Sequence, residues 1–149
     1  MENKRTNTKN RKKHLPKIVI YPIKHSQQRY DTAGDYFKDF GGKNLWWFHI
    51  SKMENPDYEF LVLIHELIEW YLTQKRGIKE KDITLFDLKN VDSEDPGSLK
   101  DAPYHREHMF SMKIEKLLAK ELGVEWKTYD KSFDKLVYEK RLKNADKKR

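Results

Sequence analysis

The chain has 149 residues, a formal net charge of +7 and no cysteine. A domain of this length can bury a hydrophobic core. The missing cysteines exclude disulfides, Cys-based zinc fingers, iron–sulfur clusters and thiol nucleophiles, so any metal must be bound by His, Asp or Glu.

The positive charge is concentrated at the two ends of the chain. Seven Lys/Arg residues lie in residues 1–17 and six in residues 139–149, which leaves residues 18–138 with a net charge of −3. We expect residues 1–16 to be a disordered basic tail and residues 143–149 a second basic tail. Such tails are either merely solvated or contact nucleic acid or another polyanion.

No segment is predicted to direct the chain to a membrane. The N-terminus lacks the apolar stretch of a signal peptide. The longest apolar run, residues 60–64, is too short to span a bilayer. The absence of disulfides gives no sign of an oxidising compartment. We therefore expect a cytoplasmic protein with no membrane partner, and the sequence leaves its oligomeric state open.

The N-terminal half carries strand patterns. The β-branched residues 17–21 precede Pro22 and predict a first strand. Residues 29–36 are expected to form a structured loop or a short hairpin. The aromatic and β-branched residues 44–51 predict a second strand.

The next segment carries clear helix signals. Asn55 and Pro56 provide an N-cap and a first helical residue, and Gly77 provides a stop after Arg76. The pattern predicts a helix between these limits. Its sides are apolar nearly all round, which indicates a buried helix.

The C-terminal half alternates loop and helix patterns. Residues 78–102 are expected to be loop-like, with a short strand or turn at 83–86. A second helix is predicted from Pro103 to Leu122, and a third from Glu125 to about Leu142. Residues 17–142 should therefore form one metal-binding α+β domain, a small antiparallel sheet followed by three helices packed on one side.

The strongest functional signal is His65 and Glu69 on the first predicted helix. Residues four apart lie on one helical face, so an imidazole and a carboxylate can reach the same metal ion. His105 or His108, near the start of the second helix, could complete the site. Two histidines and a glutamate form one class of catalytic zinc site. We therefore predict zinc, with another divalent metal as the alternative.

Glu66 lies between the two predicted ligands and is the predicted general base. Glu107 or Asp101 could orient a ligand imidazole by a hydrogen bond. In a purely structural alternative, the acids of the first helix instead form ion pairs with an arginine, the candidates being Arg29, Arg76 and Arg106. The remaining histidines are expected to be incidental: His14, His25 and His49.

Residues 65–69 resemble the active-site helix of the zincin metallopeptidases, with Glu69 where that family has a second histidine. The resemblance implies a zincin-like fold, His65 as a ligand and Glu66 as the base. Together with residues 58–61 and 102–108, this segment also makes the chain resemble a group of uncharacterised phage and bacterial proteins across most of residues 18–130. A phage protein would act in the host cytoplasm.

These observations support three functional hypotheses. The first is a small zinc-dependent hydrolase of the zincin type acting on a protein or peptide, whose extended substrate would pair with a sheet edge near residues 46–51. The second is a non-catalytic binding module stabilised by the metal. The third is a nucleic-acid-associated protein that uses its basic tails.

Overall fold

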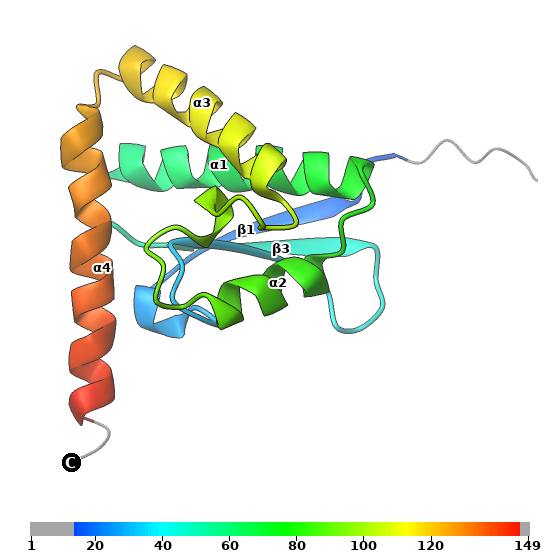
Figure 1. Ribbon diagram of the computed structural model, residues 1–149, viewed down its shortest axis with the longest axis horizontal. Coiled ribbons are helices and arrows are strands. Elements are labelled where there is room, and N and C mark those ends of the chain that lie inside the picture. The colour runs from blue at the N-terminus through cyan, green and yellow to red at the C-terminus, as the bar shows by residue number, and fades with distance from the viewer. Residues whose placement is uncertain (1–13, 147–149) are drawn as a thin grey trace, which may run out of the picture.

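The computed structural model describes residues 14–146, with side chains described as far as residue 136. The predicted tail at residues 1–16 therefore lies almost wholly outside the described residues, as does the end of the tail at 143–149. The elements follow the order β1 (Lys17–Ile23), η1 (His25–Gln27), β2 (Gly34–Lys38), β3 (Leu45–Ser51), α1 (Pro56–Lys75), α2 (Glu80–Lys89), η2 (Pro96–Ser98), α3 (His105–Glu121) and α4 (Trp126–Asp146). This composition confirms the α+β class (Figure 1).

The sheet is mixed, which corrects the expected antiparallel sheet. Its strand order is β1-β3-β2, with β3 parallel to β1 and antiparallel to β2. The chain goes first to the far edge as β2 and then returns as β3 between the two earlier strands. Because β3 is central, residues 46–51 offer no free edge, and the expectation of an edge there was wrong. The two edges are β1 and β2.

Helix α1 has the predicted limits. The Asn55 side chain accepts a hydrogen bond from the backbone N–H of Asp57 at 2.9 Å, Pro56 opens the helix, and Gly77 follows it at φ +72°. A positive φ is readily adopted by glycine, and this explains the sharp end of the helix.

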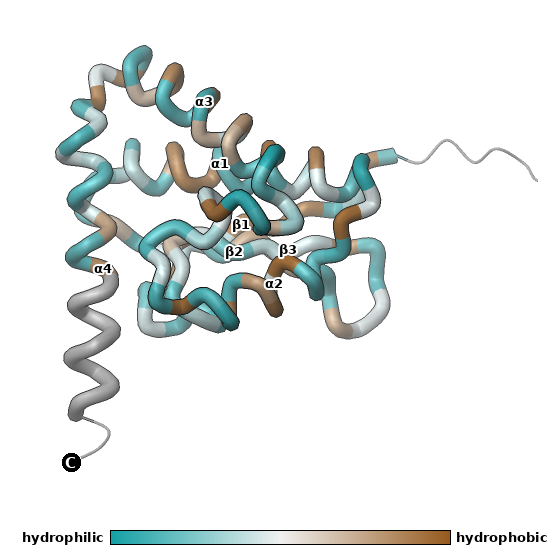
Figure 2. Tube along the Cα trace, in the orientation of Figure 1, coloured by the Kyte–Doolittle hydropathy of each residue, from teal (hydrophilic) through white to brown (hydrophobic). Residues whose placement is uncertain are grey.

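The inward face of the sheet packs against α1. Trp46, Phe48 and Ile50 alternate along β3 and are all buried. Trp70 of α1 packs edge-on against Phe48, with ring centroids 5.5 Å apart. Helices α1 and α3 lie side by side above this face (Figure 1). Hydrophobic and hydrophilic residues alternate along both helices (Figure 2), and α1 is covered by the sheet on one side and by α3 on another.

Helix α2 replaces the loop expected between residues 78 and 102. Its one fully buried side chain is Ile83, and its N-cap Lys79 makes no side-chain capping bond. The two sequence signals that usually indicate a helix, a periodic apolar face and a capping side chain, are therefore weak in this segment. The helices predicted from Pro103 and Glu125 are present as α3 and α4, and α4 extends to Asp146.

The core consists of two apolar clusters. One joins Tyr36, Trp46, Phe48 and Trp70 to Ile83 of α2. The other joins β3 and α1 to α3 and α4 through a separate set of side chains, namely Ile50, Tyr58, Leu61, Val62, Ala119 and Tyr129. His65 lies between Val62 and Trp70 along α1, so a polar layer separates the two clusters.

The core predicts a contrast between two phenylalanines. Phe48 is 0% exposed and Phe40 is 85% exposed. Phe48→Ala should lower the free energy of unfolding by about 3–5 kcal/mol because it leaves a cavity. The matched control Phe40→Ala should cost less than about 1 kcal/mol. Urea denaturation measures both, and equal losses would contradict this description of the core.

Candidate metal centre

Three side chains from two helices converge on one point. His65 and Glu69 come from α1, and His108 comes from α3. His65 Nε2 lies 3.2 Å from Glu69 Oε2 and 3.1 Å from His108 Nδ1, and the last two atoms lie 2.9 Å apart. We call this group the triad. All three residues are buried.

The far side of each triad residue is fixed by a separate hydrogen bond. His65 Nδ1 donates to Glu115 Oε2 at 2.7 Å, and His108 Nε2 donates to Asp95 Oδ1 at 2.9 Å. The hydroxyl of Tyr36 donates to Glu69 Oε1 at 3.0 Å. A carboxylate on the remote nitrogen of an imidazole is the usual way of orienting a metal-ligating histidine.

This bonding leaves three electron-pair donors facing one another. Once each imidazole uses its remote nitrogen as a donor, the inner nitrogen of a neutral ring is an acceptor. Protonated rings could both donate to Glu69, but two cationic N–H groups would then lie 3.1 Å apart. A metal ion removes either conflict. Ligands of a tetrahedral zinc lie about 3.3 Å apart, close to the spacing of the triad.

The electrostatics of the triad reflect the same crowding. Burial alone would lower the pKa of His108, but hydrogen bonds to Asp95 and Glu69 raise it to about 9. The pKa of His65 is also raised, because bonds to Glu115 and Glu69 outweigh the effect of burial. Burial would raise the pKa of Glu69, but the two imidazoles lower it to about 2. Without a metal, the triad therefore holds protons at neutral pH.

Glu66 has a different environment. Its side chain lies against Gly34, where an added Cβ would come 2.5 Å from Glu66 Cγ. Among the described residues, it has no hydrogen-bond or ion-pair partner. Burial and the nearby charge of Glu69 raise the pKa of Glu66 well above its ordinary value. A partly buried carboxyl group without a partner is suited to accept and return a proton.

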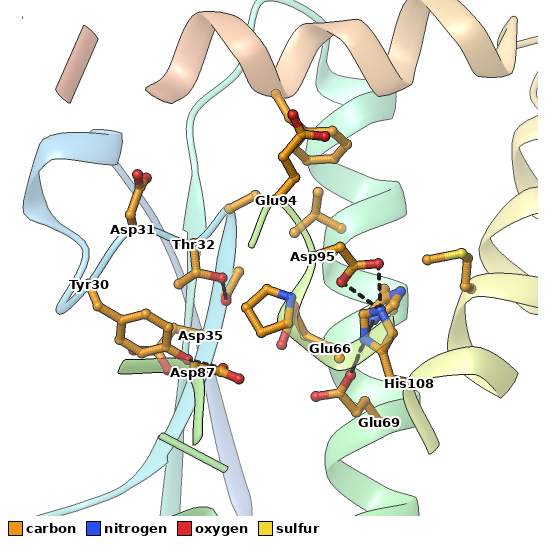
Figure 3. Close-up of a pocket in the computed structure, with 18 of the residues that line it drawn as sticks. Tyr30, Asp31, Thr32, Asp35, Glu66, Glu69, Asp87, Glu94, Asp95 and His108 are labelled. Atoms are coloured by element: carbon orange, nitrogen blue, oxygen red, sulfur yellow. Dashed lines mark hydrogen bonds and ion pairs between the residues drawn. The ribbon is translucent and has the colours of Figure 1, made fainter. Parts of the chain in front are cut away.

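Glu66 and the triad line one cavity of about 500 Å³ (Figure 3). Of the described residues that line it, eleven are Asp or Glu, and Lys131 is the one Lys or Arg. The cavity is therefore strongly anionic, although the whole chain is basic.

The structure brings together His65, Glu69 and His108, and it leaves the fourth predicted ligand outside. His105 Nδ1 bonds to the carbonyl oxygen of Gly97 at 3.0 Å instead. His105 and His108 are three residues apart, and it is His108 that α3 turns toward α1.

The acids that orient the imidazoles are not the predicted ones. Glu107 accepts a hydrogen bond from Arg76 at 2.5 Å, and the orienting roles belong to Glu115 and Asp95. Glu115 lies seven residues after His108, a spacing that places both on one helical face. That periodicity could have indicated Glu115.

Two of the three arginines proposed as structural partners bind carboxylates other than Glu66 and Glu69. Arg29 forms a bidentate ion pair with Asp35 and a further bond to Glu80. Arg76 pairs with Glu107. Of the incidental histidines, His25 is buried and bonded to Ser51 and Asp31.

Comparisons with protein-family models, with curated proteins and with solved structures each found no match to this chain. These comparisons do not support the zincin resemblance, and what bears on it is the geometry of the triad, which could hold a metal ion. In the described part of the chain, no helix is long and apolar enough to cross a membrane.

The close contact of Gly97 with the triad leads to a first prediction at this site. A Cβ at position 97 would lie 2.5 Å from His108 Nδ1. Gly97→Ala should displace the ring and weaken zinc binding at least tenfold, on the order of 1.4 kcal/mol. The control Gly41→Ala meets only the half-buried Asp39 carboxylate, which lies outside the cavity lining, and should leave zinc affinity unchanged. Competition with a chelating dye measures both, and unchanged affinity in Gly97→Ala would contradict this geometry.

The protonated triad predicts proton release on metal binding. The pKa of His108 is about 9 without metal, so below that pH a metal must displace its proton. Affinity should rise as pH increases toward 9, and up to two protons should leave from the two imidazoles. Zinc calorimetry in buffers of different ionisation enthalpy counts these protons. A binding enthalpy that does not depend on the buffer would show that the triad is not the site.

Proposed function

We propose that this protein is a zinc-dependent hydrolase acting on peptides or proteins. The observation that carries the proposal is the triad together with Glu66, a carboxylate without a partner in the same cavity. Three protein ligands leave a fourth position open, as in catalytic zinc sites. Two imidazoles and a carboxylate suit zinc better than the harder cations, which prefer oxygen ligands.

The proposed roles follow from the positions of the side chains. His65 Nε2, His108 Nδ1 and Glu69 Oε2 would hold the metal. A bound zinc ion supplies a Lewis acid and lowers the pKa of water toward about 7. Glu66 takes a proton from the attacking water and returns it to the leaving amine. Its raised pKa supports both transfers, because a carboxyl group of raised pKa is a stronger base and then holds the proton for donation.

The free edge of β2 supports a peptide substrate. This strand begins at Gly34, directly beside Glu66, and has no partner on its outer side within the described sheet. An extended peptide could pair with this edge by backbone hydrogen bonds. Its scissile bond would then pass close to Glu66.

One observation also favours the second hypothesis, a metal-stabilised module without catalysis. The triad joins α1 to α3, so a bound ion would hold these two helices together. In that case, loss of the metal would destabilise the fold, while Glu66 would be dispensable.

Variants at Glu66 and His65 separate the two functions. Purified protein should contain about one zinc per chain, and His65→Ala should lose it. Glu66→Gln should keep the zinc but lower peptide hydrolysis by about 10²–10⁴-fold. Metal analysis and a library of quenched fluorescent peptides measure these effects. His105→Ala and Glu121→Gln, both outside the triad and the cavity lining, serve as matched controls.

Two outcomes would count against a hydrolase. A protein that cannot be loaded with zinc or manganese would rule out the metal centre. If the zinc-loaded protein hydrolyses peptides only at a low rate, and Glu66→Gln does not change that rate, the protein is a metal-stabilised module and not a hydrolase.

A further inference from the structure

A second carboxylate in the cavity has an unusual set of partners. Asp87 of α2 accepts a hydrogen bond from the hydroxyl of Tyr30 at 3.1 Å and one from the hydroxyl of Tyr104 at 2.5 Å. Each tyrosine holds a different carboxylate oxygen. All three residues line the cavity, and Asp87 is only partly buried.

Other acids of the cavity are already paired with a base. Asp35 pairs with Arg29, and Asp95 pairs with His108. Asp87 has no ion-pair partner among the described residues, because phenol groups orient a carboxylate without neutralising it. Its charge is therefore available to a cation that enters the cavity.

The position of Asp87 relates it to the triad. The hydroxyl of Tyr104 bonds to Asp87, and its ring meets that of His108 edge-on with centroids 5.9 Å apart. Asp87 therefore lies about one tyrosine ring away from a proposed metal ligand. In Figure 3, Tyr30 and Asp87 lie on one side of the cavity, while His108 and Asp95 lie on the other.

The charge of the whole cavity favours the same kind of ligand. Eleven of the described lining residues are acidic and one is a lysine. Such a surface attracts cations and repels phosphate groups. A second metal ion is less well supported than an organic cation, because Asp87 does not belong to the metal-binding cluster found among the described residues.

We propose that Asp87 binds the lysine or arginine side chain of a peptide substrate beside the metal centre. This inference rests on the proposed hydrolase function and names its substrate class. Tyr30 and Tyr104 hold the carboxylate in place, and the long apolar stem of Lys or Arg lets its charged end reach Asp87 from a backbone lying near Glu66.

The test measures binding without turnover. Zinc-loaded Glu66→Gln protein is titrated with an acetylated and amidated peptide that contains arginine, and with the same peptide containing the neutral isostere citrulline. The arginine peptide should bind about 10–100-fold more tightly, as expected for a charge-assisted hydrogen bond. The difference should shrink with added salt. Equal affinities would overturn the proposal.

Variants of α2 locate the effect. Asp87→Asn in the same background should abolish the preference for arginine. Asp82→Asn makes the same chemical change at an exposed position outside the cavity lining and should leave the preference intact. A preference that survives Asp87→Asn would overturn the assignment to this residue. A citrulline peptide with a free amino terminus that binds as tightly as the arginine peptide would instead identify a terminal-amine site.

Hydrolysis by the wild-type protein separates this inference from the proposed function. Arginine peptides that bind with the predicted preference but are never cleaved would reject the hydrolase and leave the cation site standing. Peptides cleaved at equal rates whether they contain arginine or citrulline would reject the cation site and leave the hydrolase standing.

Discussion

The structure depends on the need to compensate a polar cluster buried along α1. His65 and Glu69 are buried, and a buried charge without partners would cost several kcal/mol. Partners come from two neighbouring elements, with α3 providing His108 and Glu115 and β2 providing Tyr36. The packing of α1 against α3 is therefore inseparable from the bonding of the triad. In a fold that separated these helices, each member of the cluster would be exposed to solvent or would lose its hydrogen-bond partner.

The two apolar clusters make this arrangement effective. They bury the two ends of α1 around the polar layer, and the burial of the triad strengthens the electrostatic interactions within it. Two glycines allow the closest approaches, Gly34 against Glu66 and Gly97 against His108. At both positions a side chain would occupy the space of a proposed functional group. The arrangement of the site therefore requires a residue without a Cβ at both positions.

Local interactions explain which features could be predicted from the sequence. The limits of α1 follow from Asn55 and Gly77, and the pairing of His65 with Glu69 follows from the helical repeat. Both depend only on neighbouring residues. The roles of Asp95 and Glu115, the choice of His108 over His105 and the central place of β3 depend on how distant segments approach one another. Helix α2 was missed because its single fully buried residue leaves little periodic signal.

Charge balance connects the metal centre to the rest of the cavity. Glu69, Glu115 and Asp95 surround two imidazoles, so two bound protons and one divalent cation give the cluster the same net charge. The pKa values of the two histidines are raised because bound protons supply, without a metal, the positive charge that a metal ion would otherwise supply. Either state leaves the cavity acidic, because Asp87 and other lining carboxylates lie outside this compensation. A cationic ligand would partly neutralise the remaining negative charge, whereas a polyanion would be repelled by it. The acidic cavity at the candidate metal centre therefore favours a cationic partner, whereas the basic sequence at the ends of the chain favours an anionic one.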